Sequence, residues 1–173
     1  MNEGTLRIEY DIRPVEPRDL PFLWEMLYES MYVAEGEAPF ERTLLEEPAV
    51  RKYLEDWGRS GDVGLVAEKQ DGTLLGSITA RYFTADSPGY GFVSSDVPEL
   101  GMALTADSRG KGIGQSLLTA LLRSLHDHGV KRVSLSVDPR NEPAMKLYRR
   151  CGFEVVGREG TSVTMLASTQ MEG

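Results

Sequence analysis

The spacing of apolar residues changes repeatedly along the chain between the period of a strand and the period of a helix, and this pattern restricts its possible folds. Alternating or β-prone apolar runs predict strands at residues 6–13, 63–69, 73–83, 97–105, 133–137, 154–158 and 162–167. Apolar residues that recur on one helical face predict helices at residues 19–31, 43–57, 112–128 and 141–151. The second of these helices contains Pro48, which favours a break there.

The order of the predicted elements is β-α-α-β-β-β-α-β-α-β-β. Asp71-Gly72 is a typical two-residue hairpin turn, so the strands on either side of it should be antiparallel. Single helices between later strands are typical of parallel crossovers. We therefore expect an α/β fold of the α+β type, with a mixed sheet and helices on both faces.

Charge excludes one class of partner. The chain of 173 residues carries 27 acidic and 19 basic residues, for a net charge of −8. A chain without a basic block is a poor nucleic-acid binder, because phosphate contacts need clustered lysine and arginine. The average field instead favours a cationic substrate.

Cysteine, histidine and targeting signals point to a cytoplasmic protein. Cys151 is the single cysteine, and His126 and His128 are the only histidines, so neither a disulfide within the chain nor a zinc-ligand spacing is present. The polar residues 1–4 precede no apolar signal segment, and no apolar run approaches the length of a membrane span. We expect no metal and no membrane partner.

A glycine-rich segment, Arg109-Gly-Lys-Gly-Ile-Gly114, lies between a predicted strand and a predicted helix. Free amides at a helix start, with basic side chains beside them, favour an anion such as pyrophosphate. A plain glycine turn with solvated bases explains the hexapeptide equally well. Two other phosphate motifs fit badly, because Gly112 stands where a P-loop needs Ser or Thr and Gln115 stands where a dinucleotide fingerprint needs glycine.

Two motifs together resemble the GNAT N-acetyltransferase superfamily. Arg109, Gly112 and Gly114, after the strand at 100–104, are similar to its acyl-CoA-binding motif. The second motif runs through residues 135–141 and continues with Ala144, Leu147-Tyr148 and Gly152-Phe153. The resemblance covers residues 6–167 and implies a mixed, mostly antiparallel sheet of about seven strands with splayed central strands. It also implies one N-acetyltransferase domain over 1–173, with a core at about 6–167 and short flexible termini.

The resemblance implies a binding site for acetyl-CoA as the acyl donor. The backbone of the strand would pair with the pantetheine amides, and the amides of the glycine segment would hold the pyrophosphate. The face of the following helix would line the cofactor, although Asn141 is also a good helix cap. The residues implied are Met102, Ala103, Leu104, Arg109, Gly110, Lys111, Gly112, Ile113, Gly114, Gln115, Asn141, Ala144 and Tyr148.

The resemblance also suggests two catalytic residues. Tyr148 would donate a proton to the departing thiolate, whereas the alternative is a buried aromatic residue on an amphipathic helix. Glu99, which begins the cofactor strand, is a candidate base for the substrate ammonium, and a solvated acid at a strand end explains it equally well. The amine would attack the thioester directly, and Cys151 is interpreted as a small core residue.

The binding site for the acceptor substrate is the part of the active site that the sequence defines least. The first two helices and the glycine-rich loop at 85–95 would wall its pocket, and the candidates there are Trp24, Tyr28, Tyr32, Tyr90, Phe92 and Asp96. The expected acceptor is a small-molecule or peptide amine. Dimerisation is common in the family, so a homodimer is left open, but no residue pattern indicates one. A non-catalytic acyl-CoA-sensing module is the alternative function, and a nucleotide-binding domain is a third.

Overall fold

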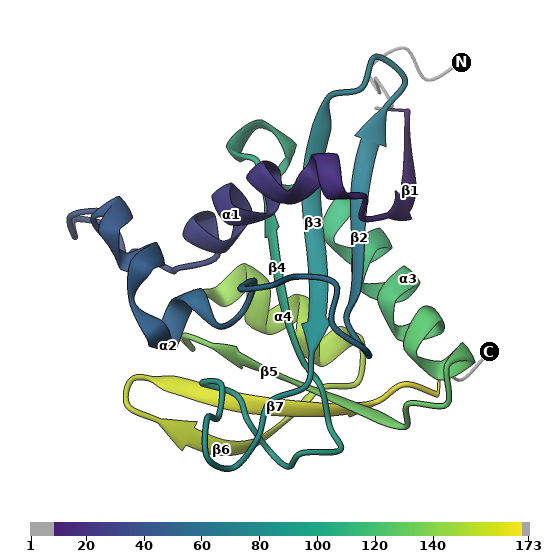
Figure 1. Cartoon of the computed structure of the whole chain (residues 1–173). Helices are drawn as coiled ribbons and strands as arrows, with labels where there is room; N and C mark the ends of the chain where they lie inside the picture. Colours follow the sequence, from purple (N-terminus) through teal and green to yellow (C-terminus); the bar gives the residue numbers. More distant parts are fainter. Residues whose placement is uncertain (1–8, 171–173) are drawn as a thin grey trace.

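A computed structural model describes residues 9–170 and contains one mixed sheet with helices on both faces (Figure 1). The seven strands lie in the order β1-β2-β3-β4-β5-β7-β6, and every neighbouring pair except β4–β5 is antiparallel. The strands are β1 Tyr10–Pro14, β2 Val63–Lys69, β3 Leu74–Arg81, β4 Glu99–Leu104, β5 Arg132–Val137, β6 Glu154–Glu159 and β7 Ser162–Ser168. The mixed, mostly antiparallel sheet is therefore confirmed.

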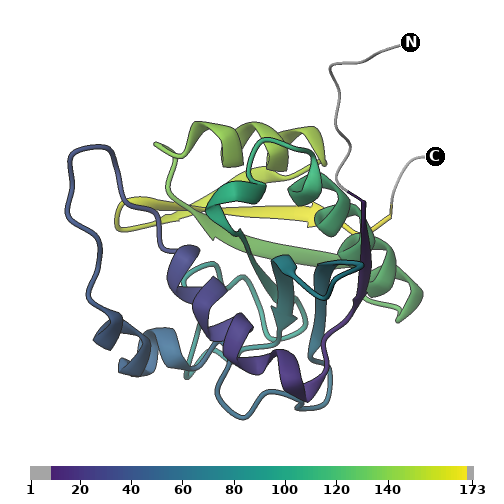
Figure 2. The same ribbon diagram turned by 90° about the horizontal axis from the view of Figure 1, so that it is seen from above.

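Helices cover both faces of the sheet (Figure 2). The helices are α1 Leu20–Glu29, α2 Pro48–Arg51, α3 Ile113–Asp127 and α4 Glu142–Arg150. The leucine-rich face of α3 and the apolar face of α4 pack on one side and form the larger core with the strands. On the other side, Leu23 of α1 packs with Leu54 and Val66 in a smaller cluster.

Most predicted elements agree with the structure to within a few residues at each end. The predicted first strand began at Leu6, and its residues 6–8 lie outside the described part of the chain. The last hairpin turns at Gly160, as predicted, and the strands around Asp71-Gly72 are antiparallel.

The predicted helix at 43–57 is wrong in extent. The chain instead forms a short 3-10 turn at Arg42–Glu46, the four-residue α2, and then a series of turns. Glu47 is extended because a residue before proline avoids helical backbone angles, and Pro48 then starts α2. Asp56 adopts a positive φ of 54°, which stops any continuation.

Buried Arg81 fixes the turns that follow α2. Its guanidinium donates to the carbonyl oxygens of Lys52 and Glu55, at 2.9 and 2.6 Å, and pairs with Asp62 at 2.8 Å. The side chains of Arg81 and Asp62 are both almost fully buried. These contacts order a segment that has little regular secondary structure of its own.

The central strands separate. β4 and β5 run parallel but pair only at Glu99 and Ser134, next to a hydrogen bond from the Ser134 amide to the Pro98 carbonyl at 3.0 Å. By contrast, β4 pairs with β3 along its whole length, from Glu99 to Leu104. The edge of β4 that faces β5 is thus without ladder partners beyond Glu99, and the expected splay is confirmed.

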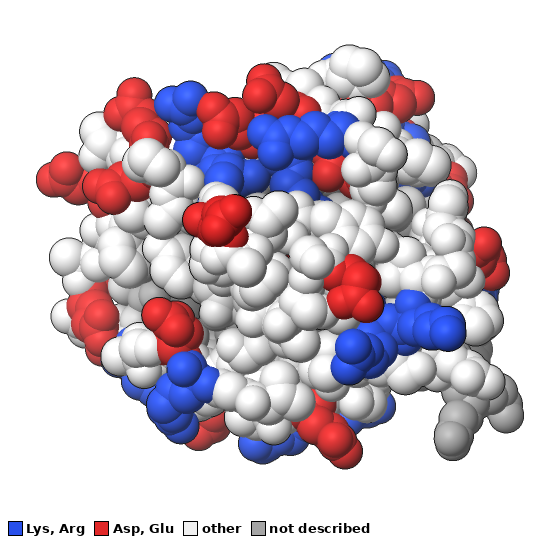
Figure 3. Space-filling model, turned by 60° about the horizontal axis from the view of Figure 1, so that its bottom comes forward, with Lys and Arg blue, Asp and Glu red and all other residues white. Residues whose placement is uncertain are grey.

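A loop at residues 82–98 connects β3 to β4 and lies over β5 and β7 (Figure 1). Figure 3 brings the lower part of that view forward, where this loop and the β6–β7 hairpin lie, and shows a broad area without charged side chains. No helix within residues 9–170 is long and apolar enough to cross a membrane.

Candidate functional site

The glycine segment forms an open turn between β4 and α3. Gly110 and Gly112 have φ values of 76° and 84°, a left-handed conformation that glycine adopts without strain. A side chain added at either position would meet no atom within 4 Å, so the space over the turn is open. Gly112 is the residue before α3, and no side chain caps the helix there. The first amides of α3 are therefore available to an anion.

Basic side chains surround this turn. Arg109 and Lys111 are exposed, and the Arg109 guanidinium lies 3.4 Å from the Glu29 carboxylate at the end of α1. Arg150 of α4 donates to Gln115 at 3.3 Å, which adds a third cation near the first turn of α3. The open backbone, the helix start and these charges fit a bound pyrophosphate.

Gly114 allows α3 to begin close to β4 and α4. A methyl group at this position would lie 3.5 Å from the side chains of Met102 and Leu147 and 3.7 Å from that of Leu104. The first turn of α3, strand β4 and the Leu147 side chain of α4 are thus brought together.

Helix α4 presents the residues of the second motif. Asn141 caps the helix, because its side-chain oxygen accepts a hydrogen bond from the Ala144 amide at 3.3 Å. Tyr148 is buried and packs edge-to-face on Phe153, with ring centroids 5.7 Å apart. Burial, and to a lesser degree Cys151, raises the pKa of Tyr148 to about 12, so the phenol keeps its proton near neutral pH. Cys151 is half-buried against the larger core.

Glu99 is a buried acid, and its interpretation as a solvated strand-end residue is wrong. Its relative exposure is 4%, and the Tyr53 hydroxyl donates to Oε2 at 2.6 Å. Burial raises its pKa to about 7, and the Tyr53 hydrogen bond, the Gly91 backbone and Lys52 reduce the increase. Among the described residues, Glu99 Oε1 and Ser134 Oγ are the two buried side-chain atoms without a hydrogen-bond partner.

The 82–98 loop covers this acid closely. A methyl group on Gly89 would stand 2.2 Å from Glu99 Oε1, and one on Gly91 would stand 2.5 Å from the backbone of Leu135. The Tyr90 amide donates to the Tyr53 hydroxyl at 2.7 Å. Sequence reasoning missed Tyr53, because it precedes Glu99 by 46 residues and no local pattern links them.

A match to a family sequence model assigns the family of this chain. The sequence model described as the Acetyltransferase (GNAT) family matches residues 20–153, which include the glycine turn, Glu99 and Tyr148. The chain belongs to the GNAT acetyltransferase family.

Relatives of this GNAT chain carry the names of acetyltransferases. Mycothiol acetyltransferase from Propionibacterium freudenreichii subsp. shermanii is 31% identical over 121 residues, which are 70% of this chain and 36% of that protein. Streptothricin acetyltransferase from Streptomyces lavendulae is 26% identical over 154 residues, which are 85% of this chain and 78% of that protein. The chain spans about a third of the length of the mycothiol acetyltransferases that it matches.

Solved GNAT structures share the fold. One such structure is the PaiA N-acetyltransferase from Thermoplasma acidophilum in complex with coenzyme A. It matches with a TM-score of 0.68 at 24% identity, and the match covers 92% of this chain and 99% of the PaiA chain. The ribosomal-protein-alanine N-acetyltransferase from Brucella melitensis has a TM-score of 0.65 at 24% identity, with coverages of 91% and 99%. The GNAT fold expected from the two motifs is confirmed.

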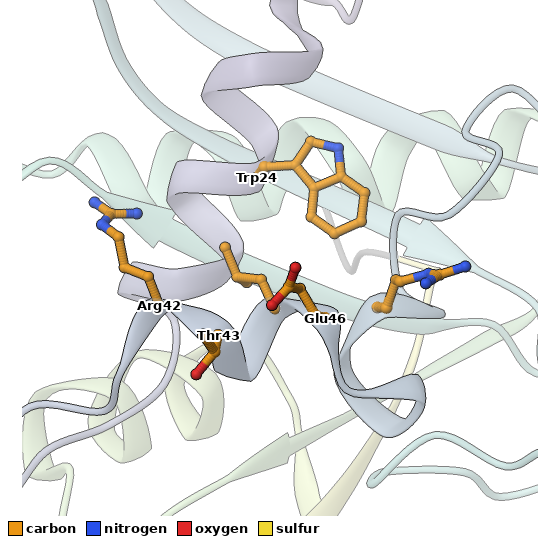
Figure 4. A pocket seen from close by; sticks show the side chains of 6 residues that line it. Trp24, Arg42, Thr43 and Glu46 are labelled. Carbon is orange, nitrogen blue, oxygen red and sulfur yellow. The ribbon is translucent and has the colours of Figure 1, made fainter.

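The predicted acceptor residues of this GNAT chain do not gather in one place. Trp24 lines a shallow hollow of about 530 Å³ between α1 and the α2 region, together with Arg42, Thr43, Leu45, Glu46 and Arg51 (Figure 4). The Tyr28 hydroxyl donates to the Phe40 carbonyl, and the Tyr32 hydroxyl donates to that of Arg140 at 3.3 Å. Both tyrosines therefore hold the segment between α1 and α2.

The remaining acceptor candidates lie in the 82–98 loop. Tyr90 is 46% exposed and stacks on Tyr53 with the ring centroids 6.4 Å apart. Phe92 is half-buried, and Asp96 is exposed and bonded to Ser94, which lowers its pKa. Tyr90 is thus the acceptor candidate that the structure connects, through Tyr53, to Glu99.

Proposed function

We propose that the chain is an N-acetyltransferase that moves an acetyl group from acetyl-CoA to a primary amine. The observation that carries this proposal is the junction of β4 and β5, where one residue pair is followed by a free strand edge beside the open turn before α3. A free edge of this kind can bond an extended ligand through main-chain groups.

The described residues fit a coenzyme A thioester. The backbone of residues 102–104 would pair with pantetheine amides, and the amides of residues 110–114, with Arg109, would hold the pyrophosphate. Asn141 would serve mainly as the cap of α4, and Ala144 would let a ligand approach that helix closely. Acetyl-CoA would supply the activated acetyl group.

The two titratable residues suit the two proton transfers. Glu99 would take one proton from the substrate ammonium through water, because its carboxylate is buried, and the free amine would then attack the thioester carbonyl. As the carbon–sulfur bond breaks, Tyr148 would give its proton to the thiolate and recover one from the newly acylated nitrogen. Glu99 releases its proton to solvent, so the reaction yields the amide, the free thiol and one proton.

The acceptor class follows from charge and from the relatives. The net charge of −8 favours a cation, and the names of the relatives specify the small molecules mycothiol and streptothricin. We therefore place a small-molecule amine ahead of a peptide amine. A panel of both, assayed for release of the free CoA thiol, tests the proposal. Tight acetyl-CoA binding without thiol release across the panel would indicate a sensing module instead.

Removing the cation beside the open turn should weaken cofactor binding. We expect Arg109→Ala to raise the Kd for acetyl-CoA about tenfold, because a guanidinium–phosphate contact is charge-assisted but exposed here. Isothermal titration calorimetry measures this change. Arg18→Ala, which removes an exposed arginine paired with Glu16, is the matched control and should bind normally. Equal affinities of all three proteins would remove Arg109 from the cofactor site.

Tyr148→Phe should reduce kcat by about 100-fold, because the thiolate would leave without a general acid. The phenyl ring preserves the packing on Phe153, so the melting temperature should change little. Steady-state assays at saturating acetyl-CoA measure the loss. Turnover at the wild-type rate would show that Tyr148 is only a core residue.

A further inference from the structure

We propose that Tyr53 is a positioning residue that holds one oxygen of Glu99 and leaves the other, Oε1, to receive the substrate proton. The inference rests on the proposed role of Glu99 as the base. It concerns a residue outside both motifs, on the turns after α2.

The hydrogen bonds of the Tyr53 hydroxyl have a defined direction. The hydroxyl accepts the Tyr90 amide proton at 2.7 Å, and it lies 2.6 Å from Glu99 Oε2. A phenol has a single proton to donate, so that proton points to the carboxylate. Burial and the nearby carboxylate hold the pKa of Tyr53 far above its usual range, which keeps the phenol protonated.

Tyr53 is itself held in place. Arg81 binds the carbonyl oxygens of Lys52 and Glu55 on either side of it, and Arg81 is the β3 residue paired with Glu99 in the sheet. The Tyr53 ring packs edge-to-face on Phe83 at 4.9 Å and parallel to Tyr90. A donor fixed in this way can keep a carboxylate in one orientation.

The consequence for Glu99 lies in its two oxygens. Oε2 accepts the Tyr53 bond, whereas Oε1 is buried and no side chain donates to it, so an incoming proton would go to Oε1. The other groups around Glu99 are Lys52, whose ammonium donates to the Pro88 carbonyl, the Gly91 backbone and Ser134, which pairs with Glu99 in the sheet. Arg81 faces the same region but is engaged by Asp62. Tyr53 is therefore the side chain that donates directly to this carboxylate.

The decisive experiment measures Glu99 without relying on activity. In protein labelled with 13C at glutamate side-chain carbonyls, the Glu99 signal is identified by its loss in Glu99→Gln. We expect it to titrate near pH 7 in the free wild-type protein. In Tyr53→Phe we expect a midpoint about one pH unit higher, a tenfold gain in proton affinity, because the ionised form loses its donor. The rising limb of the pH profile of kcat/KM should move by the same amount.

Tyr10→Phe is the matched control, because it removes the phenol bond to Ser116 on the opposite side of the sheet from Tyr53. It should leave the Glu99 midpoint unchanged. A second measurement uses wild-type protein only: the ring carbon bonded to the Tyr53 hydroxyl should show a 13C shift change with the same midpoint as Glu99.

The outcomes separate the two proposals. An unchanged Glu99 midpoint in folded Tyr53→Phe, or a Tyr53 carbon that ignores the Glu99 titration, overturns the role of Tyr53 even in an active enzyme. A shifted midpoint together with normal turnover in Glu99→Gln overturns the role of Glu99 as the base. Coincident shifts of the midpoint and of the pH profile support both.

Discussion

Glu99→Gln should lower kcat/KM by about 100-fold or more at pH 8, because the amide cannot accept the ammonium proton. In the wild type the rate should rise with pH through a midpoint near 7, since only the ionised carboxylate is a base and burial raises its pKa to about 7. In the Glu99→Gln variant, this rise of the rate with pH should be absent. Initial rates across pH 5.5–9 measure both effects. A wild-type pH profile in the variant would exclude Glu99 as the base.

The same substitution should change how stability depends on pH. The pKa of Glu99 is higher in the folded protein than its ordinary value of 4.5. The stabilising contribution of Glu99 to the free energy of unfolding is therefore complete below pH 4.5 and is lost as the pH rises through about 7. From pH 4 to pH 8 the wild type should therefore lose about 3 kcal/mol relative to Glu99→Gln. Urea unfolding of both proteins across this range measures the difference. Parallel stability curves would mean that Glu99 titrates normally.

Gly91→Ala should be the most damaging small substitution in the 82–98 loop. The added methyl would stand 2.5 Å from the Leu135 carbonyl carbon and 2.7 Å from the Ser136 nitrogen. That backbone cannot yield easily, because β5 is paired with β7 on its other edge. We expect a loss of about 3 kcal/mol and a fall in Tm on the order of 10 °C. Thermal unfolding followed by circular dichroism measures it.

Gly157→Ala in β6 is the matched control for this loss. Its added methyl would approach only Thr164, at 3.8 Å, which is ordinary contact. Its Tm should stay within a few degrees of the wild type. If Gly91→Ala also melted with the wild type, the loop would not be packed against β5 as described.

Local pattern was enough to predict most of the fold. Alternation, helical spacing and the Asp71-Gly72 turn depend on neighbours in sequence, and they located every strand and the three longer helices. The α2 region was predicted as too long, because its apolar residues recur at helical spacing while Glu47 and Asp56 take non-helical angles. Tertiary contacts from Arg81 then hold the turns, and local periodicity does not report them.

The candidate site also has a part that local sequence predicts and a part that depends on tertiary contacts. The glycine turn could be predicted because its chemistry lies in consecutive residues. The burial of Glu99 could not, because it depends on Tyr53 and Gly89 from other segments. The acceptor aromatics Tyr28 and Tyr32 were predicted from their side-chain type and from the place of the first two helices in the family fold, and the structure shows their hydroxyls donating to backbone carbonyls.

The single residue pair between β4 and β5 also has a mechanical consequence. The sheet consists of two hydrogen-bonded halves, β1–β4 and β5–β7, joined by almost no ladder bonds and held together mainly by the shared core beneath α3 and α4. We expect the two halves to separate along this junction more readily than either half loses its own ladder bonds. A cosubstrate bound between the two halves would contact both of them. The free energy of unfolding of this protein would therefore increase with the concentration of that cosubstrate.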